Sequence, residues 1–215
     1  MAMTMRGWLM RNPRKPVLAA VLLAAALALA SCGGNGDSEK TGKGEQAASP
    51  PRPEVLFRFQ KFASAPLVDG SDVVTLRSLE GKVVVLDLFA TWCPPCRQSV
   101  PILVGLHQRF QGKGLEMVGL AYENTDDAAQ DRLKVAGFRQ EMKIPYPLAI
   151  GPQVVWEELE AKAHADRVIP TILLLDRQGV VREMFQGLAP AEETALAERI
   201  EKLLAEPFVP LPRSD

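Results

Sequence analysis

Runs of apolar residues along the chain predict a series of strands and helices. Residues 83–89 (VVVLDLF) form an almost unbroken aliphatic run, which is the pattern of a strand buried on both faces of a sheet. Residues 97–111 carry apolar side chains at roughly helical spacing, so they predict a helix soon after that strand. Similar patterns predict further strands at 115–121, 146–150, 172–176 and 180–185, and helices at 125–140, 154–164 and 191–205.

An N-terminal hairpin precedes this series. Residues 55–62 and 73–76 have strand-like patterns, and Asp69-Gly70 supplies a turn sequence between them. Towards the C-terminus, Arg177-Gln178-Gly179 turns the last two predicted strands into a second hairpin. The folded domain is therefore expected to occupy residues 54–206, and the Pro-rich residues 207–215 a loose tail.

The first 31 residues differ from the rest of the chain. They hold an apolar run from Val17 to Ala30 and no acidic residue, and the basic residues that precede the run are Arg6, Arg11, Arg14 and Lys15. The run is shorter than the roughly 20 residues that a membrane-spanning helix needs. A basic segment followed by a short apolar one predicts an export signal over residues 1–31.

A cysteine stands directly after this signal. The sequence Leu29-Ala30-Ser31-Cys32 resembles the lipobox of bacterial lipoproteins, in which the Cys is diacylated and becomes the new N-terminus. On this resemblance Cys32 is a lipid anchor; an ordinary cleaved signal that ends near a Cys is the alternative. The residues after it, up to residue 53, are mainly Gly, Ser, Lys, Glu and Pro, so residues 32–53 are expected to form a lipid-anchored solvated tether.

Composition and charge exclude several classes of protein. The chain has 25 Lys and Arg against 26 Asp and Glu, and 47% of its residues are apolar. These values fit a globular protein and exclude a collagenous, coiled-coil or wholly disordered chain. Because there is no basic excess to neutralise phosphates, no nucleic-acid partner is expected. No repeat or heptad demands an oligomer, so a monomer is expected.

Removal of Cys32 as an anchor leaves two cysteines, Cys93 and Cys96. Such a pair is a structural disulfide, half of a metal site, a haem attachment motif or a redox couple. Haem attachment needs His after the second Cys, where this chain has Arg97. A closed zinc site needs four ligands, and His107 lies about three helical turns beyond Cys96, so no metal is expected. A structural bridge across so small a loop removes little chain entropy, which favours the redox couple.

The cysteine pair lies between the apolar strand and the helix that follows it. Proline is tolerated in a first helical turn, where its missing N–H would have had no partner. The positive end of the helix dipole and the free N–H groups of that turn favour a thiolate over a thiol. Strand, short loop and Cys at a helix N-terminus therefore form an arrangement that activates a thiol.

Residues 89–96 (FATWCPPC) resemble the active site of the thioredoxin superfamily, specifically the exported, membrane-tethered thiol–disulfide oxidoreductases of the TlpA/ResA type. Residues 168–175 (VIPTILLL) match the cis-proline loop of that superfamily and the strand after it. The resemblance runs from about residue 55 to residue 205. It implies an α/β, thioredoxin-like fold, with a central mixed sheet flanked by helices, an N-terminal β-hairpin extension and a strand–helix insertion at about residues 122–150.

The resemblance also implies roles for three residues. Cys93 is expected to be the exposed attacking thiol, and Cys96 the resolving thiol that forms a disulfide with it. Asp87 falls where thioredoxin keeps a buried Asp, although many TlpA-like proteins have Asn there. A buried carboxyl has a raised pKa and can take the proton from Cys96 as it becomes a nucleophile. A buried polar residue without a catalytic part is the alternative for Asp87.

Substrate contacts are expected around the same pair. A cis peptide bond between Ile169 and Pro170 would place the backbone of Ile169 beside the cysteines, where an extended substrate segment can pair with it. Trp92 is expected to form an apolar platform, with ordinary packing as an equal alternative. The full set of expected substrate-binding residues is Trp92, Pro94, Pro95, Ile169, Pro170 and Thr171.

The two prolines between the cysteines bear on the direction of electron flow. They remove two N–H donors that would stabilise the Cys93 thiolate, which makes the couple less oxidising. The sequence thus predicts a protein-disulfide reductase without a cofactor, recharged by a membrane thiol–disulfide electron donor. Its expected substrates are disulfides of exported proteins, which in this family include apocytochrome c. The expected location is the bacterial cell envelope, lipid-anchored and facing the periplasm or the exterior.

Three other functions remain open at this point. A peroxiredoxin-like peroxidase shares the fold but uses a Pro-x-x-x-Thr-x-x-Cys context, which Cys93 lacks. A Sco-like copper chaperone uses a wider Cys spacing and a distant His, for which His164 is the candidate. A non-catalytic module that holds unfolded exported chains would survive the loss of both thiols.

Overall fold

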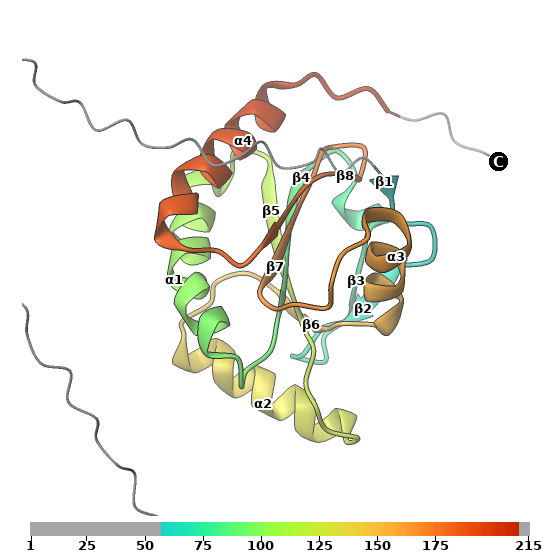
Figure 1. The fold of residues 1–215 in the computed structure, drawn as a ribbon, viewed down its shortest axis with the longest axis vertical. Coiled ribbons are helices and arrows are strands. Elements are labelled where there is room, and N and C mark those ends of the chain that lie inside the picture. The colour runs from blue at the N-terminus through green and yellow to red at the C-terminus, as the bar shows by residue number, and fades with distance from the viewer. Residues whose placement is uncertain (1–56, 211–215) are drawn as a thin grey trace, which may run out of the picture. The chain divides into compact units, whose positions relative to one another are not determined.

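A six-stranded mixed sheet forms the centre of the computed structural model, which describes residues 57–210 (Figure 1). The strand order is β1-β8-β7-β4-β5-β6, in which β4, β5 and β6 run parallel and the other neighbouring pairs antiparallel. The strands are β1 (Phe57–Arg58), β4 (Val83–Phe89), β5 (Leu115–Ala121), β6 (Leu148–Ile150), β7 (Thr171–Leu175) and β8 (Val180–Gln186). The predicted fold class is confirmed, whereas the predicted signal, Cys32 and the tether lie outside the described residues.

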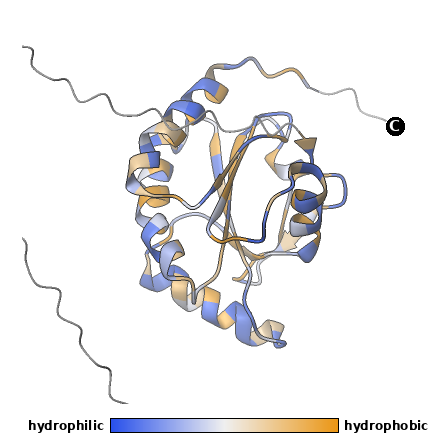
Figure 2. Ribbon diagram, in the orientation of Figure 1, coloured by the Kyte–Doolittle hydropathy of each residue, from blue (hydrophilic) through white to orange (hydrophobic). Residues whose placement is uncertain are grey.

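Helices cover both faces of this sheet. Helices α1 and α4 lie on one side and α3 on the other, with α2 below α1 in the view of Figure 1. Figure 2 shows the strands largely hydrophobic and the helices polar on their outer sides. The helices are α1 (Pro94–Phe110), α2 (Ala128–Glu141), α3 (Gln153–Ala163) and α4 (Glu193–Ala205), and the 3₁₀ turns are η1 (Arg77–Leu79) and η2 (Pro190–Glu192). Within residues 57–210 no helix is long and apolar enough to cross a membrane.

Strand β4 separates two apolar cores, and all seven of its residues are buried. Its side chains alternate between the two faces, as strand geometry requires. Val85 and Phe89 join the core beneath α1 and α4, whereas Leu86 and Leu88 join the core beneath α3. Asp87 follows the alternation of Val85 and Phe89, so its side chain enters the core beneath α1.

The N-terminal hairpin forms with a different first strand from the predicted one. Strand β2 (Ser64–Pro66) pairs with β3 (Val73–Thr75), and Gly70 takes a φ of 73° in the turn between them. Within the predicted strand 55–62, Phe57 and Arg58 instead form β1, which pairs with β8 at the edge of the main sheet. The chain turns away after β1 because the Glu158 carboxylate accepts the backbone N–H groups of Gln60, Lys61 and Phe62.

The predicted insertion consists of α2 and β6, between β5 and α3. The Asp127 side chain caps α2 by accepting hydrogen bonds from the N–H groups of Ala129 and Gln130. Strand β6 adds a parallel edge beyond β5, and it is shorter than the predicted strand 146–150. Tyr146 therefore precedes β6, but its side chain is still buried in the core beneath α1.

Candidate active site around the Cys93–Cys96 disulfide

Cys93 and Cys96 are joined by a disulfide at the beginning of α1, with 5.3 Å between their Cα atoms. Strand β4 ends at Phe89, and Cys93 is the N-cap residue of α1, so Pro94 and Pro95 occupy the first two helical positions. The backbone N–H of Cys96 donates a hydrogen bond to the Cys93 sulfur at 3.2 Å. The local sequence thus places one sulfur at the positive end of the helix dipole.

The structure corrects the expectation that Cys93 is exposed. In this disulfide-bonded form Cys93 is 3% exposed and Cys96 is fully buried. Both sulfurs belong to the core beneath α1, because the helix begins close against the sheet. The neighbouring residues are much more open, since Trp92 is 53% exposed and both prolines of the motif are exposed. In this form little of Cys93 is therefore open to a partner's sulfur, although the residues next to it in the sequence are exposed.

The predicted proline loop lies against the cysteines. The peptide bond between Ile169 and Pro170 is cis, and the carbonyl oxygen of Ile169 lies 3.8 Å from the Cys93 sulfur. The loop is held from behind by two hydrogen bonds: the Thr171 hydroxyl donates to the Val168 carbonyl at 2.6 Å, and the Gly187 N–H donates to the Pro170 carbonyl at 2.7 Å. Within residues 57–210 no other backbone group pairs with the backbone of Ile169.

These positions divide the six expected substrate-binding residues into two groups. Trp92, Pro94 and Pro95 are exposed and Ile169 is half-buried, so these four can meet a partner. Pro170 and Thr171 are buried, and their contacts shape the loop from the inside. Sequence reasoning missed Val168, an apolar side chain that is 46% exposed one residue before Ile169. An isolated Val before a proline motif carries no signal that would have singled it out.

Asp87 lies on β4 beneath α1 and is 2% exposed. Burial raises the pKa of its carboxyl to about 7, because the ionised form loses its hydration. One of its oxygens, Oδ1, has no hydrogen-bond partner among the described residues. The carboxyl can therefore hold or release a proton near neutral pH, in the same core layer as Cys96.

A glutamate that the sequence did not single out holds the loop before the cysteines. The Glu123 carboxylate accepts hydrogen bonds from the backbone N–H and the hydroxyl of Thr91, both at 2.8 Å. Glu123 follows β5, whose last residue pairs with the last residue of β4. The parallel pairing thus brings the two loops together. No local pattern could reveal this contact, because the two residues are 32 positions apart.

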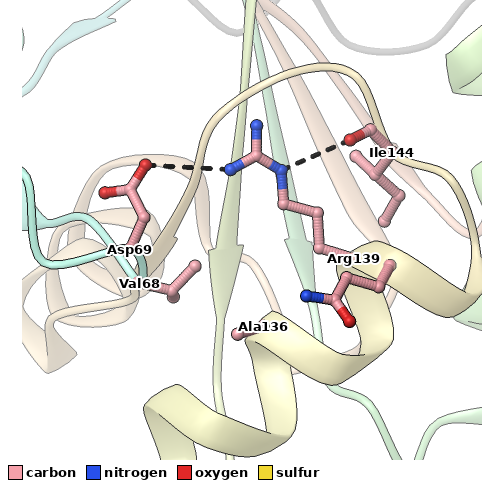
Figure 3. Close-up of a pocket in the computed structure, with 6 residues that line it drawn as sticks. Val68, Asp69, Ala136, Arg139 and Ile144 are labelled. Carbon is pink, nitrogen blue, oxygen red and sulfur yellow. Dashed lines mark hydrogen bonds and ion pairs between the residues drawn. The ribbon is translucent and has the colours of Figure 1, made fainter.

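Figure 3 shows a pocket of about 350 Å³ between the hairpin turn and α2. The Arg139 guanidinium crosses it, donating from Nε to the Ile144 carbonyl at 3.3 Å and lying 3.8 Å from the Asp69 carboxylate. None of the predicted site residues lines this pocket, whose lining is Val68, Asp69, Ala136, Arg139, Gln140 and Ile144. The two charged side chains of the pocket, Asp69 and Arg139, pair with each other, and this ion pair joins the hairpin to α2.

The two histidines do not gather around the cysteines. His107 is half-buried on α1 with its ring 5.8 Å from the Tyr146 ring, and His164 is exposed at the end of α3. Across residues 57–210 no three His, Cys, Asp or Glu side chains converge in a way that could hold a metal ion. The copper-chaperone alternative therefore gains no support from this part of the chain.

The structure has a disulfide at a helix N-terminus, beside a cis-proline loop on a mixed sheet. This combination defines the class of protein: a thioredoxin-like thiol–disulfide oxidoreductase of the TlpA/ResA type. The chain belongs to the Redoxin family, whose sequence profile matches residues 58–200. The matched segment contains β4, α1, the proline loop and the insertion.

Individual relatives agree with this assignment. Thiol-disulfide oxidoreductase ResA of Bacillus thuringiensis subsp. konkukian is 27% identical over 130 residues, which cover 60% of this chain and 68% of that protein. Protein DipZ of Mycobacterium bovis is 29% identical over 147 residues, which cover 67% of this chain and 20% of DipZ. The structure of a thiol-disulfide isomerase from Corynebacterium glutamicum is 25% identical with a TM-score of 0.54, and covers 69% of this chain and 97% of that one.

Proposed function

We propose that this protein reduces disulfide bonds of exported proteins by exchange through Cys93 and Cys96. The observation that carries the proposal is the position of the Cys93 sulfur, at the N-terminus of α1, bonded to Cys96 and 3.8 Å from the Ile169 carbonyl. The name of the ResA relative describes a thiol–disulfide oxidoreductase, which supports the same chemistry here.

The exchange has two steps. In the reduced protein the Cys93 thiolate attacks one sulfur of a substrate disulfide; the S–S bond of the substrate breaks, a mixed disulfide forms, and the first substrate sulfur leaves as a thiolate that takes a proton. Cys96 then loses its proton and attacks the Cys93 sulfur, which releases the second substrate sulfur. Two electrons pass from the Cys pair to the substrate, and the protein finishes in the disulfide form that the structure shows.

Asp87 is the proposed acceptor for the proton of Cys96. Its carboxyl is buried in the same layer as Cys96, and burial raises its pKa to about 7, so its ionised form is a stronger base than an exposed carboxylate. The base is needed in the second step, because Cys96 is fully buried and no solvent base reaches it. The Cys93 thiolate instead depends on the helix N-terminus.

The substrate segment is proposed to lie along the proline loop. The backbone of Ile169 pairs with no other described backbone group, so an extended segment can add to it as a short strand. The exposed side chains of Trp92 and Val168 lie in sequence directly before Cys93 and Ile169. They give this docking surface two apolar contacts, on which neighbouring substrate side chains can pack.

Reduction is the proposed direction because the Cys93 thiolate has few donors. With Pro94 and Pro95 in the first turn, the N–H of Cys96 is the hydrogen bond that the helix gives to the sulfur. A less stabilised thiolate makes the disulfide form relatively more stable and the couple more reducing. A thiol–disulfide donor in the membrane is then required to return the pair to the reduced state.

The same proposal includes the predicted lipid anchor at Cys32 and an envelope location facing the periplasm or exterior. Its support is the sequence: the basic and apolar segment before Cys32 and the polar tether after it. Apocytochrome c, with a Cys pair that must be reduced before haem attachment, is the proposed substrate.

The deciding experiment is trapping in the native envelope with the full chain. Cys96→Ser removes the resolving sulfur, so an exchange partner should remain joined to Cys93 as a mixed disulfide that a reducing agent dissolves. Cys93→Ser with Cys96 intact is the matched control, and this variant should trap no exchange partner. The proposal fails if Cys96→Ser captures no more protein than Cys93→Ser, and the apocytochrome assignment fails if the captured chains lack a haem-binding Cys pair.

A further inference from the structure

Two buried oxygens beneath α1 are left without a hydrogen-bond partner by the described residues. They are Oδ1 of Asp87 and the hydroxyl of Tyr146. Asp87 is 2% exposed and Tyr146 is 1% exposed, so neither group is solvated at the surface. Buried polar groups in folded proteins are nearly always paired, if necessary through an enclosed water molecule. Tyr146 lies in the core layer that Asp87 enters, near enough for the charge of Asp87 to affect its hydroxyl, so one enclosed water molecule could pair with both oxygens.

The sheet register leaves Tyr146 as the group that can meet Asp87. On β5 the residue paired with Asp87 is Gly119, and on β7 it is Ile172; neither has a polar side chain. Gly119 is in turn paired with Leu148 of β6, two residues after Tyr146. Because side chains alternate along an extended segment, Tyr146 and Leu148 enter the same core, beneath α1. A side chain at 119 would collide with Leu148 and Phe89.

Within residues 57–210, the ionisable members of the core over Asp87 are Cys93, Cys96 and Tyr146, and the charged Arg97 of α1 lies over the Phe138 ring and pairs with Glu141. Helix α1 contributes Cys93 and Cys96 together with apolar residues, and the buried residues that α2 and α4 add to this core are Val135, Phe138, Leu196, Ala197, Ile200 and Leu203. His107 of α1 is the other ionisable side chain next to Tyr146, with 5.8 Å between the two ring centroids.

The phenol of Tyr146 acts as a donor when the Asp87 carboxyl is ionised, because an ionised carboxylate only accepts hydrogen bonds. Burial, and the nearby charge of Asp87, raise the pKa of the Tyr146 hydroxyl well above its usual range, so it keeps its proton. A hydroxyl that donates to a carboxylate stabilises the ionised form. The hydroxyl therefore lowers the pKa of Asp87, whereas burial raises it.

We propose that Tyr146 is a positioning residue for Asp87: its hydroxyl donates a hydrogen bond to one shared buried water molecule, which in turn donates to the ionised carboxylate. The inference rests on the proposed function for its consequence, which is that Tyr146 sets the pH at which Asp87 accepts the proton of Cys96. Without the hydroxyl the carboxyl would hold its proton to higher pH, and the resolving step would lose rate at neutral pH.

The direct test follows the protonation of Asp87 by infrared difference spectroscopy of the oxidised full chain across pH, with Asp87→Asn to assign the carboxyl band. Tyr146→Phe keeps the ring that fills the core and removes only the hydroxyl. We expect it to move the titration midpoint of Asp87 up by about one half to one pH unit. An unchanged or lowered midpoint would overturn the inference.

Two control variants separate this effect from general ones. Tyr122→Phe removes the other Tyr hydroxyl, which donates to the Pro152 carbonyl and belongs to the opposite core, so the midpoint should stay unchanged. His107→Gln removes the neighbouring ionisable ring and should also leave most of the shift caused by Tyr146→Phe in place. If Tyr122→Phe moved the midpoint as far as Tyr146→Phe does, the inference would be wrong.

The kinetic consequence is measured separately, as the rate of mixed-disulfide resolution against pH. We expect Tyr146→Phe to shift the pH midpoint of this rate by the same amount and in the same direction as the infrared midpoint. If Asp87→Asn leaves the resolution rate unchanged at every pH, the proposed role of Asp87 in proton transfer fails, and the infrared result still decides whether Tyr146 governs the carboxyl.

Discussion

The backbone N–H of Cys96 donates a hydrogen bond to the Cys93 sulfur across 3.2 Å. An N-cap side chain accepts from the N–H groups of the second or third helical residue. Here the second is Pro95, which has no N–H, and the third is Cys96. Cys96 is therefore the donor and Cys93 the acceptor of the one N-cap hydrogen bond that this sequence allows, and the same two residues form the redox disulfide.

Restoring the missing donor should make the pair more oxidising. We predict that Pro95→Ala places a second N–H on the Cys93 sulfur and stabilises its thiolate. The pKa of Cys93 should fall, and the reduction potential should rise by about 20–40 mV, which corresponds to about 1–2 kcal/mol for a two-electron couple. Equilibration with glutathione buffers measures the potential, and the pH dependence of alkylation of the reduced protein measures the pKa.

Pro94→Ala is the matched control for this prediction. It restores an N–H at the first helical position, where the group is too far around the turn to reach a cap side chain. Its potential should remain within about 10 mV of the unmodified protein, a shift well below a tenfold change in equilibrium. Equal shifts from both substitutions would show that loss of proline rigidity, rather than the cap hydrogen bond, governs the potential.

Asp87 should make stability depend on pH. Its pKa is raised from 3.8 to about 7 in the folded protein, so the folded state binds the proton more tightly than the unfolded chain. Burial of the carboxyl does not lower the free energy of unfolding below about pH 4, where it is protonated in both states. It lowers that free energy most above about pH 7, where the buried carboxyl is ionised. We predict that Asp87→Asn raises the free energy of unfolding on the order of 2–4 kcal/mol at pH 8.

Urea unfolding of the oxidised protein at pH 4.5 and pH 8 measures this difference. The gain in unfolding free energy from Asp87→Asn should be about 1 kcal/mol or less at the lower pH and several times larger at the higher one. Asp176→Asn is a suitable comparison, because Asp176 is also buried but is paired with Arg182. That substitution should destabilise at both pH values, since it leaves the guanidinium with a weaker partner.

The sequence alone was sufficient for the fold and for the position of the cysteines. Strand β4 could be predicted because burial on both faces leaves a continuous apolar run, and α1 because its apolar residues recur at helical spacing. The Cys-Pro-Pro-Cys motif is local, so its position at a helix N-terminus followed directly. In each case the signal lies within a few consecutive residues.

The features that sequence reasoning missed depend on contacts between distant segments. The Glu123 contact with Thr91 arises from parallel pairing of β4 and β5, and the first strand of the hairpin was misplaced because Glu158 of α3 binds the chain at Phe62. The burial of Cys93 depends on how closely α1 begins against the sheet. Neither the hydrophobic periodicity of the sequence nor a local motif indicates any of these contacts.

Glu158 should stabilise the attachment of the N-terminal segment to α3. Its carboxylate accepts three backbone N–H groups at 2.7–2.8 Å and pairs with Lys162 at 3.0 Å. Burial alone would raise its pKa, but these hydrogen bonds outweigh it and lower the pKa from 4.5 to about 2. We predict that Glu158→Gln lowers the free energy of unfolding by about 1–2 kcal/mol at pH 7.

The sign of the pH dependence distinguishes this effect from a packing defect. A carboxyl with a lowered folded pKa contributes its stability above the unfolded value and loses it as pH falls from about 4.5 towards about 2. In acid unfolding experiments, the difference in unfolding free energy between Glu158→Gln and the unmodified protein should therefore become smaller as the pH falls through this range. Glu157→Gln changes the exposed neighbour on α3 and should have little effect.

Trp92 should act in opposite directions on small and large reactants. Cys93 is 3% exposed, whereas Trp92, the residue directly before it, is 53% exposed, so we expect Trp92→Ala to widen the approach to the disulfide. We predict that dithiothreitol then reduces the disulfide about two- to fivefold faster, whereas the reduced variant acts about tenfold more slowly on a peptide disulfide. A tenfold loss corresponds to about 1.4 kcal/mol, which is the size of one lost aromatic contact in the transition state.

Val209→Ala provides the control, because Val209 is an exposed apolar residue near the turn between β7 and β8. That turn follows Leu175, which pairs with Val84 at the opposite end of β4 from Cys93. Both rates should be unchanged in this variant. If Trp92→Ala instead slowed both reactions equally, the indole would be part of the packing that supports the cysteines, and the apolar docking surface would lose its main residue.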